Sequence, residues 1–151
     1  MAKNVIKRLF PKLDKIKEDK ILKIFGPAVL QPNLWHINKK SVSRGFAIGV
    51  FCAFLPIPGV QMVLAAFLAI TFAANLPIAV TLTWISNPFT YAPIFYFATQ
   101  AGEIFINSET NTEPLLLGLI VFSIIGSMLS YMIIRIYWRY YIKKIWSKRK
   151  K

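Results

Sequence analysis

Residues 45–105 read GFAIGVFCAFLPIPGVQMVLAAFLAITFAANLPIAVTLTWISNPFTYAPIFYFATQAGEIF, and this stretch decides how the chain folds. It contains no Lys, Arg or Asp, and its only acid is Glu103, near its far end. Two proline-centred breaks interrupt it, at residues 56–61 (PIPGVQ) and 86–93 (SNPFTYAP). A solvated globular surface could hardly be built from such a segment. The sequence therefore predicts an all-α integral membrane protein with short, broken or re-entrant helices.

The basic residues lie at the two ends of the chain. Of 19 Lys and Arg residues, eleven fall between Lys3 and Arg44 and eight between Arg135 and Lys151, within a net charge of +13. Positive charge near membrane ends stays cytoplasmic, so we expect both termini inside and an even number of crossings. We also expect the lipid bilayer, with anionic lipid headgroups at the basic ends, as the main partner. Nucleic acid is not expected, because no compact domain remains to present a groove-reading element.

The distribution of basic and apolar residues divides the chain into three parts. Residues 1–32 alternate basic and apolar positions at helical spacing, which predicts a cytoplasmic, amphipathic interfacial helix or a short helix packed on the rest. Residues 33–137 form the membrane domain, and residues 138–151 a cytoplasmic basic tail. Within the membrane domain we expect four elements: a re-entrant hairpin (45–74), a broken crossing (78–106), an outer loop (107–113) and a full transmembrane helix (114–134).

Two other topologies stay open at this stage. Residues 45–74 could form one broken helix that runs straight through, or three complete crossings could precede the outer loop, although the pieces are short for that. Gly45 and Gly49 form a small-xxx-small pair that would let a neighbouring helix approach closely. Small residues on one side of the last helix predict a second packing face: Ser123, Gly126, Ser127 and Ser130.

The two breaks are the candidate functional site. Irregular backbone at membrane depth is tolerated only where it is buried in protein or lines a wet cavity, and broken helix ends form substrate sites in transporters. The residues expected to make the breaks are Pro56, Pro58, Gly59, Pro77, Pro88 and Pro93. The polar side chains at or near them, and so the substrate-path candidates, are Gln61, Ser86, Asn87, Thr90 and Gln100. The alternative is that these groups simply cap the broken helices.

Catalysis has little support in the sequence. The apolar core contains no His, Asp or Lys, and Glu103 is better explained as an interfacial charge than as a proton-coupling group. One cysteine, Cys52, allows no disulfide within the chain, and neither a metal site nor a cofactor is expected. We therefore expect a protein that is not an enzyme.

Several short motifs together resemble a known bacterial membrane family, domain of unknown function 2062. They are residues 33–42 (NLWHINKKSV), 45–49 (GFAIG), 54–59 (FLPIPG), 75–77 (NLP), 84–88 (WISNP) and Thr90. The resemblance covers roughly residues 30–130 and implies the inner membrane of Gram-negative bacteria. Relatives often carry a basic residue just before the Asn-Leu-Pro motif, where this chain has Ala74. The resemblance implies location and architecture, and no reaction.

Two functions are compatible with this interpretation of the sequence. The first is a small multipass inner-membrane protein, compatible with a homo-oligomer, that acts in transport or lipid handling through the two proline-broken segments. The second is a non-transporting scaffold or adaptor that holds envelope-biogenesis proteins or organises lipid through its basic ends.

Overall fold

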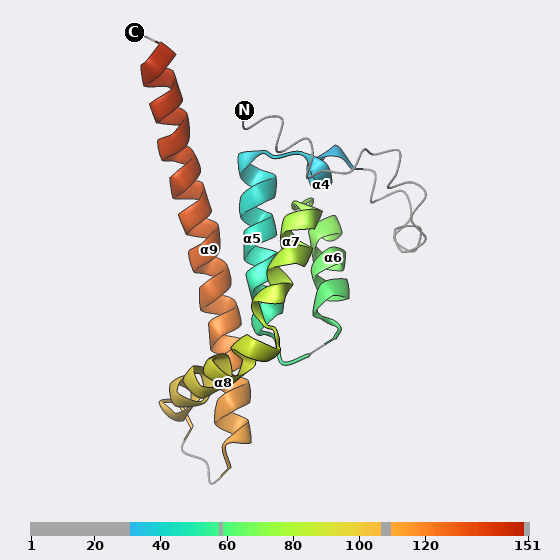
Figure 1. Ribbon diagram of the computed structural model, residues 1–151, viewed down its shortest axis with the longest axis vertical. Helices are drawn as coiled ribbons and strands as arrows, with labels where there is room; N and C mark the ends of the chain where they lie inside the picture. The colour runs from blue at the N-terminus through green and yellow to red at the C-terminus, as the bar shows by residue number, and fades with distance from the viewer. Residues whose placement is uncertain (1–30, 58, 107–109, 150–151) are drawn as a thin grey trace.

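The computed structural model describes residues 31–57, 59–106 and 110–149, and all regular structure within these ranges is helical. The all-α prediction is therefore confirmed for the described residues. The helices, labelled as in Figure 1, are α4 (Pro32–Trp35), α5 (Lys39–Phe54), α6 (Gln61–Thr71), α7 (Leu76–Leu82) with the 3₁₀ turn η2 (Thr83–Ile85), α8 (Pro88–Glu103) and α9 (Thr112–Arg149). The predicted interfacial helix falls almost wholly on residues 1–30, outside the described residues, and so does part of the predicted outer loop, at 107–109.

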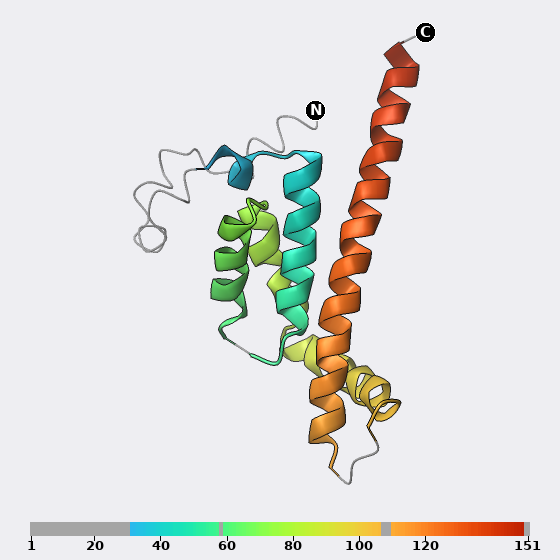
Figure 2. The same ribbon diagram turned by 180° about the vertical axis from the view of Figure 1, so that it is seen from behind.

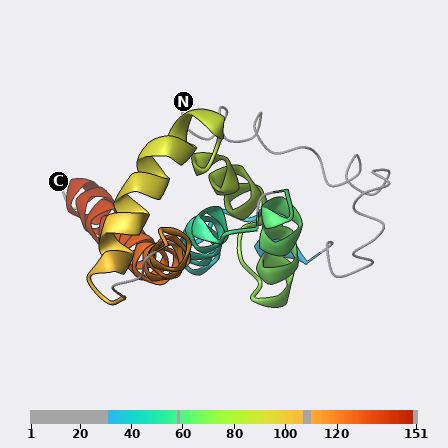
Figure 3. The same cartoon turned by 90° about the horizontal axis from the view of Figure 1, so that it is seen from below.

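The axes of α5, α6, α7 and α9 are roughly aligned, and α8 lies across them (Figure 1). α5, α6 and α7 stand side by side with alternating direction, and the long α9 runs beside α5 (Figures 1 and 2). α8 crosses near the end of the bundle where α5 finishes, as the view from below shows (Figure 3). The start of α5 and the C-terminal end of α9 lie toward the same end of the molecule (Figure 1).

The first break is a turn that sends the chain back along α5. α5 starts at Lys39, because the Asn38 side chain caps it by accepting a hydrogen bond from the Ser41 amide at 2.8 Å. It ends at Phe54, just before the Leu55-Pro56 pair, since a residue that precedes proline is pushed out of helical geometry. Gly59 then adopts φ +86°, a left-handed conformation that favours glycine.

α5 and α6 form a hairpin whose ends return to the same level. The Asn75 amide donates to the Ser41 carbonyl oxygen at 3.0 Å, and the Arg44 guanidinium donates to the Phe72 carbonyl oxygen at 2.9 Å. The corner after α6 thus lies beside the first turns of α5. Sixteen residues of α5 reach about 24 Å along the helix axis. The chain therefore does not run straight on through residues 45–74.

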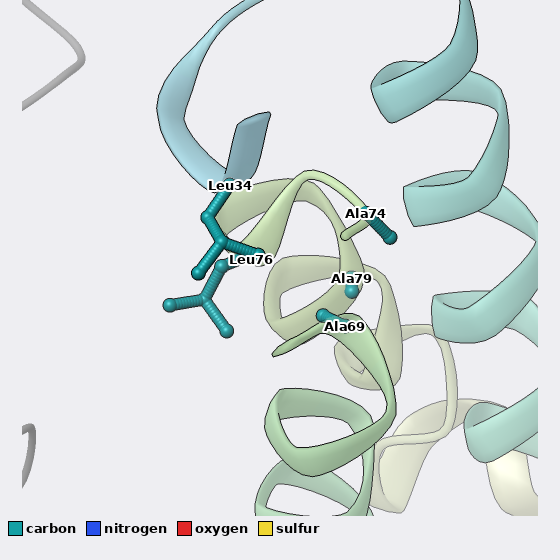
Figure 4. Packing of buried hydrophobic residues seen from close by; sticks show 5 residues of the cluster. All are labelled: Leu34, Ala69, Ala74, Leu76 and Ala79. Atoms are coloured by element: carbon teal, nitrogen blue, oxygen red, sulfur yellow. The ribbon is translucent and has the colours of Figure 1, made fainter. Parts of the chain in front are cut away.

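The two glycines of α5 allow α7 to pack against its backbone. A Cβ on Gly45 would lie 2.8 Å from the Asn75 carbonyl oxygen, and one on Gly49 would lie 2.6 Å from Leu82 Cβ. The predicted close approach at this small-xxx-small pair is confirmed. A small apolar core closes the corner where α4, α6 and α7 meet (Figure 4). Its buried members are Leu34, Ala69, Ala74, Leu76 and Ala79.

α8 differs from the sequence prediction in two respects. Pro93 does not break it: the helix starts at Pro88 and continues through Pro93 to Glu103. A capping box between Asn87 and Thr90 sets the start of the helix before Pro93, so that proline removes one intrahelical hydrogen bond without ending the helix. Residues 78–106 are also not one broken crossing along the bundle, because α8 lies across it (Figure 3).

Backbone-to-backbone contact with α9 holds α8 in this transverse position. Gly102 of α8 lies against the Pro114 carbonyl, and Gly118 of α9 lies against the Ala98 carbonyl. A Cβ on either glycine would overlap those atoms. Two helices can approach this closely only where a glycine stands at each contact, so this pair of glycines sets the crossing.

α9 is longer than the predicted transmembrane helix. Its Thr112–Ile142 stretch, which contains an 18-residue window with a mean hydropathy of 2.2, is long and apolar enough to cross a membrane. The prediction ended this helix at residue 134 and placed a separate tail at 138–151, but α9 continues to Arg149. Residues 135–149 contain neither Gly nor Pro, so nothing in them stops a helix. Its packing face is as predicted: Ser123 is buried, and Gly126 lies against Val50 and Phe54 of α5.

Candidate functional site

The two breaks meet at the end of α5. Gln61, at the start of α6, donates from Nε2 to the carbonyl oxygens of Ala53 at 3.2 Å and Leu55 at 2.9 Å. Ser86, from the second break, lies with its Oγ within hydrogen-bonding distance of the same Ala53 oxygen and 3.3 Å from Gln61 Oε1. The last carbonyls of a helix have no intrahelical donor, so these side chains supply donors to the end of α5.

Asn87 and Thr90 form the cap of α8. Asn87 Oδ1 accepts from the amides of Phe89 at 2.9 Å and Thr90 at 3.2 Å. Thr90 Oγ1 accepts from the Asn87 amide at 2.9 Å and donates to the Ile85 carbonyl oxygen at 2.6 Å. These bonds orient α8 relative to the second break. The polar atoms of this pair are therefore engaged by backbone within the break.

Gln100 does not belong to this group. It lies three turns further along α8 and donates from Nε2 to Glu103 Oε2 at 3.2 Å, on the exposed side of the helix. The structure thus brings together Gln61, Ser86, Asn87 and Thr90 at the junction of the breaks and places Gln100 elsewhere. Pro77 is also remote, because it opens α7 at the other end of the hairpin.

Two adjoining cavities flank the polar junction. One, of about 270 Å³, is walled mainly by apolar side chains, among them Phe54, Ile94 and Leu119. The other, of about 300 Å³, lies on the side of Gly59, Trp84 and Pro88. Gln61, Ser86 and Tyr91 line both. Tyr91 was not among the predicted site residues; its position one helical turn after Asn87 was the available signal, since residues four apart share a helix face.

The site is polar at one spot and apolar around it. Among the described residues, every buried side-chain nitrogen or oxygen has a hydrogen-bond partner. No group of three or more His, Cys, Asp or Glu side chains in the described part of the chain could hold a metal ion. The cavities offer mainly apolar walls with a few hydroxyl and amide groups.

The cavities lie toward one end of the α9 span. Leu119 lines the cavity of about 270 Å³, and α8 crosses α9 at Pro114 and Gly118. At about 1.5 Å of rise per residue, Arg135 lies about 26–32 Å further along the helix. The ring of Phe54, at the end of α5, stands edge-on to Phe122 with centroids 6.1 Å apart. The hairpin therefore turns near the same level as the cavities.

The sequence comparison identifies the family. A bacterial family described as uncharacterized proteins conserved in bacteria, domain of unknown function 2062, matches residues 22–147. The chain belongs to this family. The match extends past the motifs in residues 33–90 at both ends. It takes in all of α8 and nearly all of α9, so the family covers nearly the whole described bundle. No curated protein and no solved structure matches the chain.

Proposed function

We propose that the chain is a small multipass protein of the bacterial inner membrane, with α9 crossing the bilayer and both ends facing the cytoplasm. The length and hydropathy of Thr112–Ile142 support this. The 26–32 Å between the α8 crossing and Arg135 is close to the hydrocarbon thickness of a bilayer, about 30 Å. Lys39 lines a common cavity with Arg135 and Arg139, so the basic ends of α5 and α9 gather at one level, as the distribution of positive charge in membrane proteins favours.

In this arrangement the α5–α6 hairpin is re-entrant from the cytoplasmic side, and α8 lies near the outer interface. Aromatic side chains gather at membrane interfaces, and α8 with the turn before it exposes several: Trp84, Phe89, Phe95, Tyr96 and Phe97. The outer position of α8 follows from its crossing at the opposite end of α9 from Arg135.

We further propose that the activity is lipid handling, with the cavities at the breaks taking a hydrocarbon chain. The observation that carries this is the convergence of Gln61 and Ser86 on the Ala53 carbonyl beside two largely apolar cavities. These polar groups satisfy the interrupted backbone, which apolar surroundings require. A pathway for polar solutes would need polar groups free to replace water along its length, so the bonding of these groups favours lipid over a polar solute.

Photocrosslinking tests the proposal directly. The full-length protein would be reconstituted with phosphatidylethanolamine that carries a diazirine at the end of one acyl chain, and adducts would be mapped by mass spectrometry. We expect adducts on residues 91–95. Leu119, 3% exposed, lines the cavity, whereas Leu116, on the same helix, is 43% exposed and does not. Leu119→Phe should therefore reduce these adducts, and Leu116→Phe should leave them unchanged.

The control for this experiment is the thermal stability of both variants in detergent. Adducts that are equally abundant in the two variants, with both proteins folded, would mean that lipid contacts only the outside of α8. That outcome would overturn the lipid-handling proposal.

A second candidate is the scaffold or adaptor for envelope-biogenesis proteins. The observation that favours it is the complete pairing of buried polar side chains in the described residues, which is what a purely structural break requires. On this alternative, substitutions at Gln61 act only through stability, and neutralising the basic residues 3–20 and 148–151 removes function. A deletion strain complemented with each variant, with protein levels measured in parallel, separates the two.

A further inference from the structure

A further cavity lies at the opposite end of α5, about 22 Å along the helix from the breaks. It measures about 340 Å³ and is formed by the first residue of α5 and one face of α9. Its lining consists of Lys39, Tyr131, Met132, Arg135, Ile136 and Arg139. Three of these six side chains are cationic, so the cavity concentrates positive charge between two helices.

Arg135 is held in place within this cavity. Its Nη1 donates to the Tyr131 hydroxyl at 2.8 Å, and its guanidinium lies over the Tyr131 ring, 5.3 Å from the centroid. A guanidinium fixed by a hydrogen bond and by a cation–π contact loses less side-chain freedom when it binds an anion. Its remaining N–H groups match the oxygen pairs of a phosphate.

Nothing acidic in the described residues neutralises this charge. The described acids are Glu103 and Glu113, and both lie at the far end of the bundle. Glu113 precedes Arg135 by 22 residues on α9, which is about 33 Å. The other four acids of the chain, Asp14, Glu18, Asp19 and Glu109, lie outside the described residues. The positive end of the α5 dipole, at Lys39, adds to the field.

We propose that this cavity is a specific binding site for a phosphate group. Lys39, Arg135 and Arg139 supply the positive charge, and Tyr131 orients Arg135. Met132 and Ile136 provide an apolar wall on the side of the α9 span, which fits a phosphate that carries a hydrocarbon chain. The site is distinct from the general attraction of basic termini to anionic lipid, and it does not depend on the cavities at the breaks.

Native mass spectrometry of the full-length protein in an uncharged maltoside detergent tests the site. The probe is phosphatidic acid, titrated to give an apparent Kd, with phosphatidylcholine as the reference lipid. We expect Arg135→Gln and Lys39→Gln each to weaken phosphatidic acid binding about tenfold, the size expected for loss of a hydrogen bond to a charged group. Lys40→Gln is the matched control. It removes the same charge from the next residue, which does not line the cavity, and should change the Kd less than about twofold in this uncharged micelle.

The variants also separate the two sources of phosphate. If millimolar inorganic phosphate displaces the lipid from the wild type but not from Arg135→Gln, the site takes a free phosphate. If inorganic phosphate has no effect, the site takes a lipid phosphate. Circular dichroism melts establish that each variant is folded, and Tyr131→Phe provides a milder change that should give an intermediate Kd. Equal weakening by Lys40→Gln and Arg135→Gln, or no weakening by either, would overturn the proposal.

Discussion

Replacing Gly49 by alanine tests the close packing of α5 on α7. An added Cβ would lie 2.6 Å from Leu82 Cβ and 2.7 Å from the Ala79 carbonyl oxygen. Carbon atoms in contact are about 3.5–4.0 Å apart, so α7 would have to move by about 1 Å. Overpacking of this kind costs about 1–3 kcal/mol, whereas alanine gains up to about 1 kcal/mol over glycine in helix propensity. We expect Gly49→Ala to lower the free energy of unfolding by about 1–2 kcal/mol.

Gly126→Ala is the control that separates packing from helix propensity. Its Cβ would lie 3.1 Å from Val50 Cγ1, a methyl group that can turn away, so alanine should leave stability unchanged or raise it by up to about 1 kcal/mol. The assay is unfolding by sodium dodecyl sulfate in maltoside micelles, followed by far-ultraviolet circular dichroism. The reasoning is refuted if Gly49→Ala is as stable as the wild type, or if both variants shift stability by the same amount in the same direction.

Three further predictions follow from the breaks and the hairpin. Asn87→Ala should destabilise the protein by about 1 kcal/mol through loss of the α8 cap, and Asn87→Ser should restore most of it in the same unfolding assay. Gln61→Met and Ser86→Ala should each lower the free energy of unfolding by about 1–3 kcal/mol. Because both side chains reach one carbonyl oxygen, a double-mutant cycle should give a coupling energy of at least about 0.5 kcal/mol. Strictly additive effects of the two substitutions would contradict this. The topology can be tested in a variant in which serine replaces the native cysteine. In intact cells Glu113→Cys should react with an impermeant maleimide, whereas Thr71→Cys should react only after permeabilisation. Labelling of both from one side would disprove the proposed topology.

Local sequence chemistry predicted that the helices are interrupted near Pro56 and Pro88, but it did not predict the start of α8 or the end of α9. The end of α5 before Pro56 and the start of α8 at Pro88 follow from the restricted backbone of proline and its neighbours, which acts within a few residues. Gln61 and Ser86 were identified because polar side chains beside a broken apolar helix must satisfy free backbone groups. The same local rules failed at Pro93, where a cap already set by Asn87 and Thr90 let the helix continue.

The candidate site could be predicted only in part. Asn87 and Thr90 act on backbone within their own segment, so their positions in the sequence were sufficient to find them. Gln100 was assigned to the site by its proximity in sequence to the second break, but α8 carries it away as a continuous helix. Tyr91 was missed because its place between two cavities depends on how α8 is oriented against α5 and α6.

By itself the sequence determined the helical class, the family, the apolar span of α9 and the charge at both ends, because these depend on composition and on local backbone preference. Only the tertiary structure decided that α8 lies across the bundle, that Gln61 and Ser86 share one carbonyl, and that Lys39 meets Arg135 and Arg139. The contacts behind these features join residues 12 to 100 positions apart. Such contacts follow from how closely helix faces pack, at Gly102 and Gly118 above all, and no periodicity along the chain encodes that geometry.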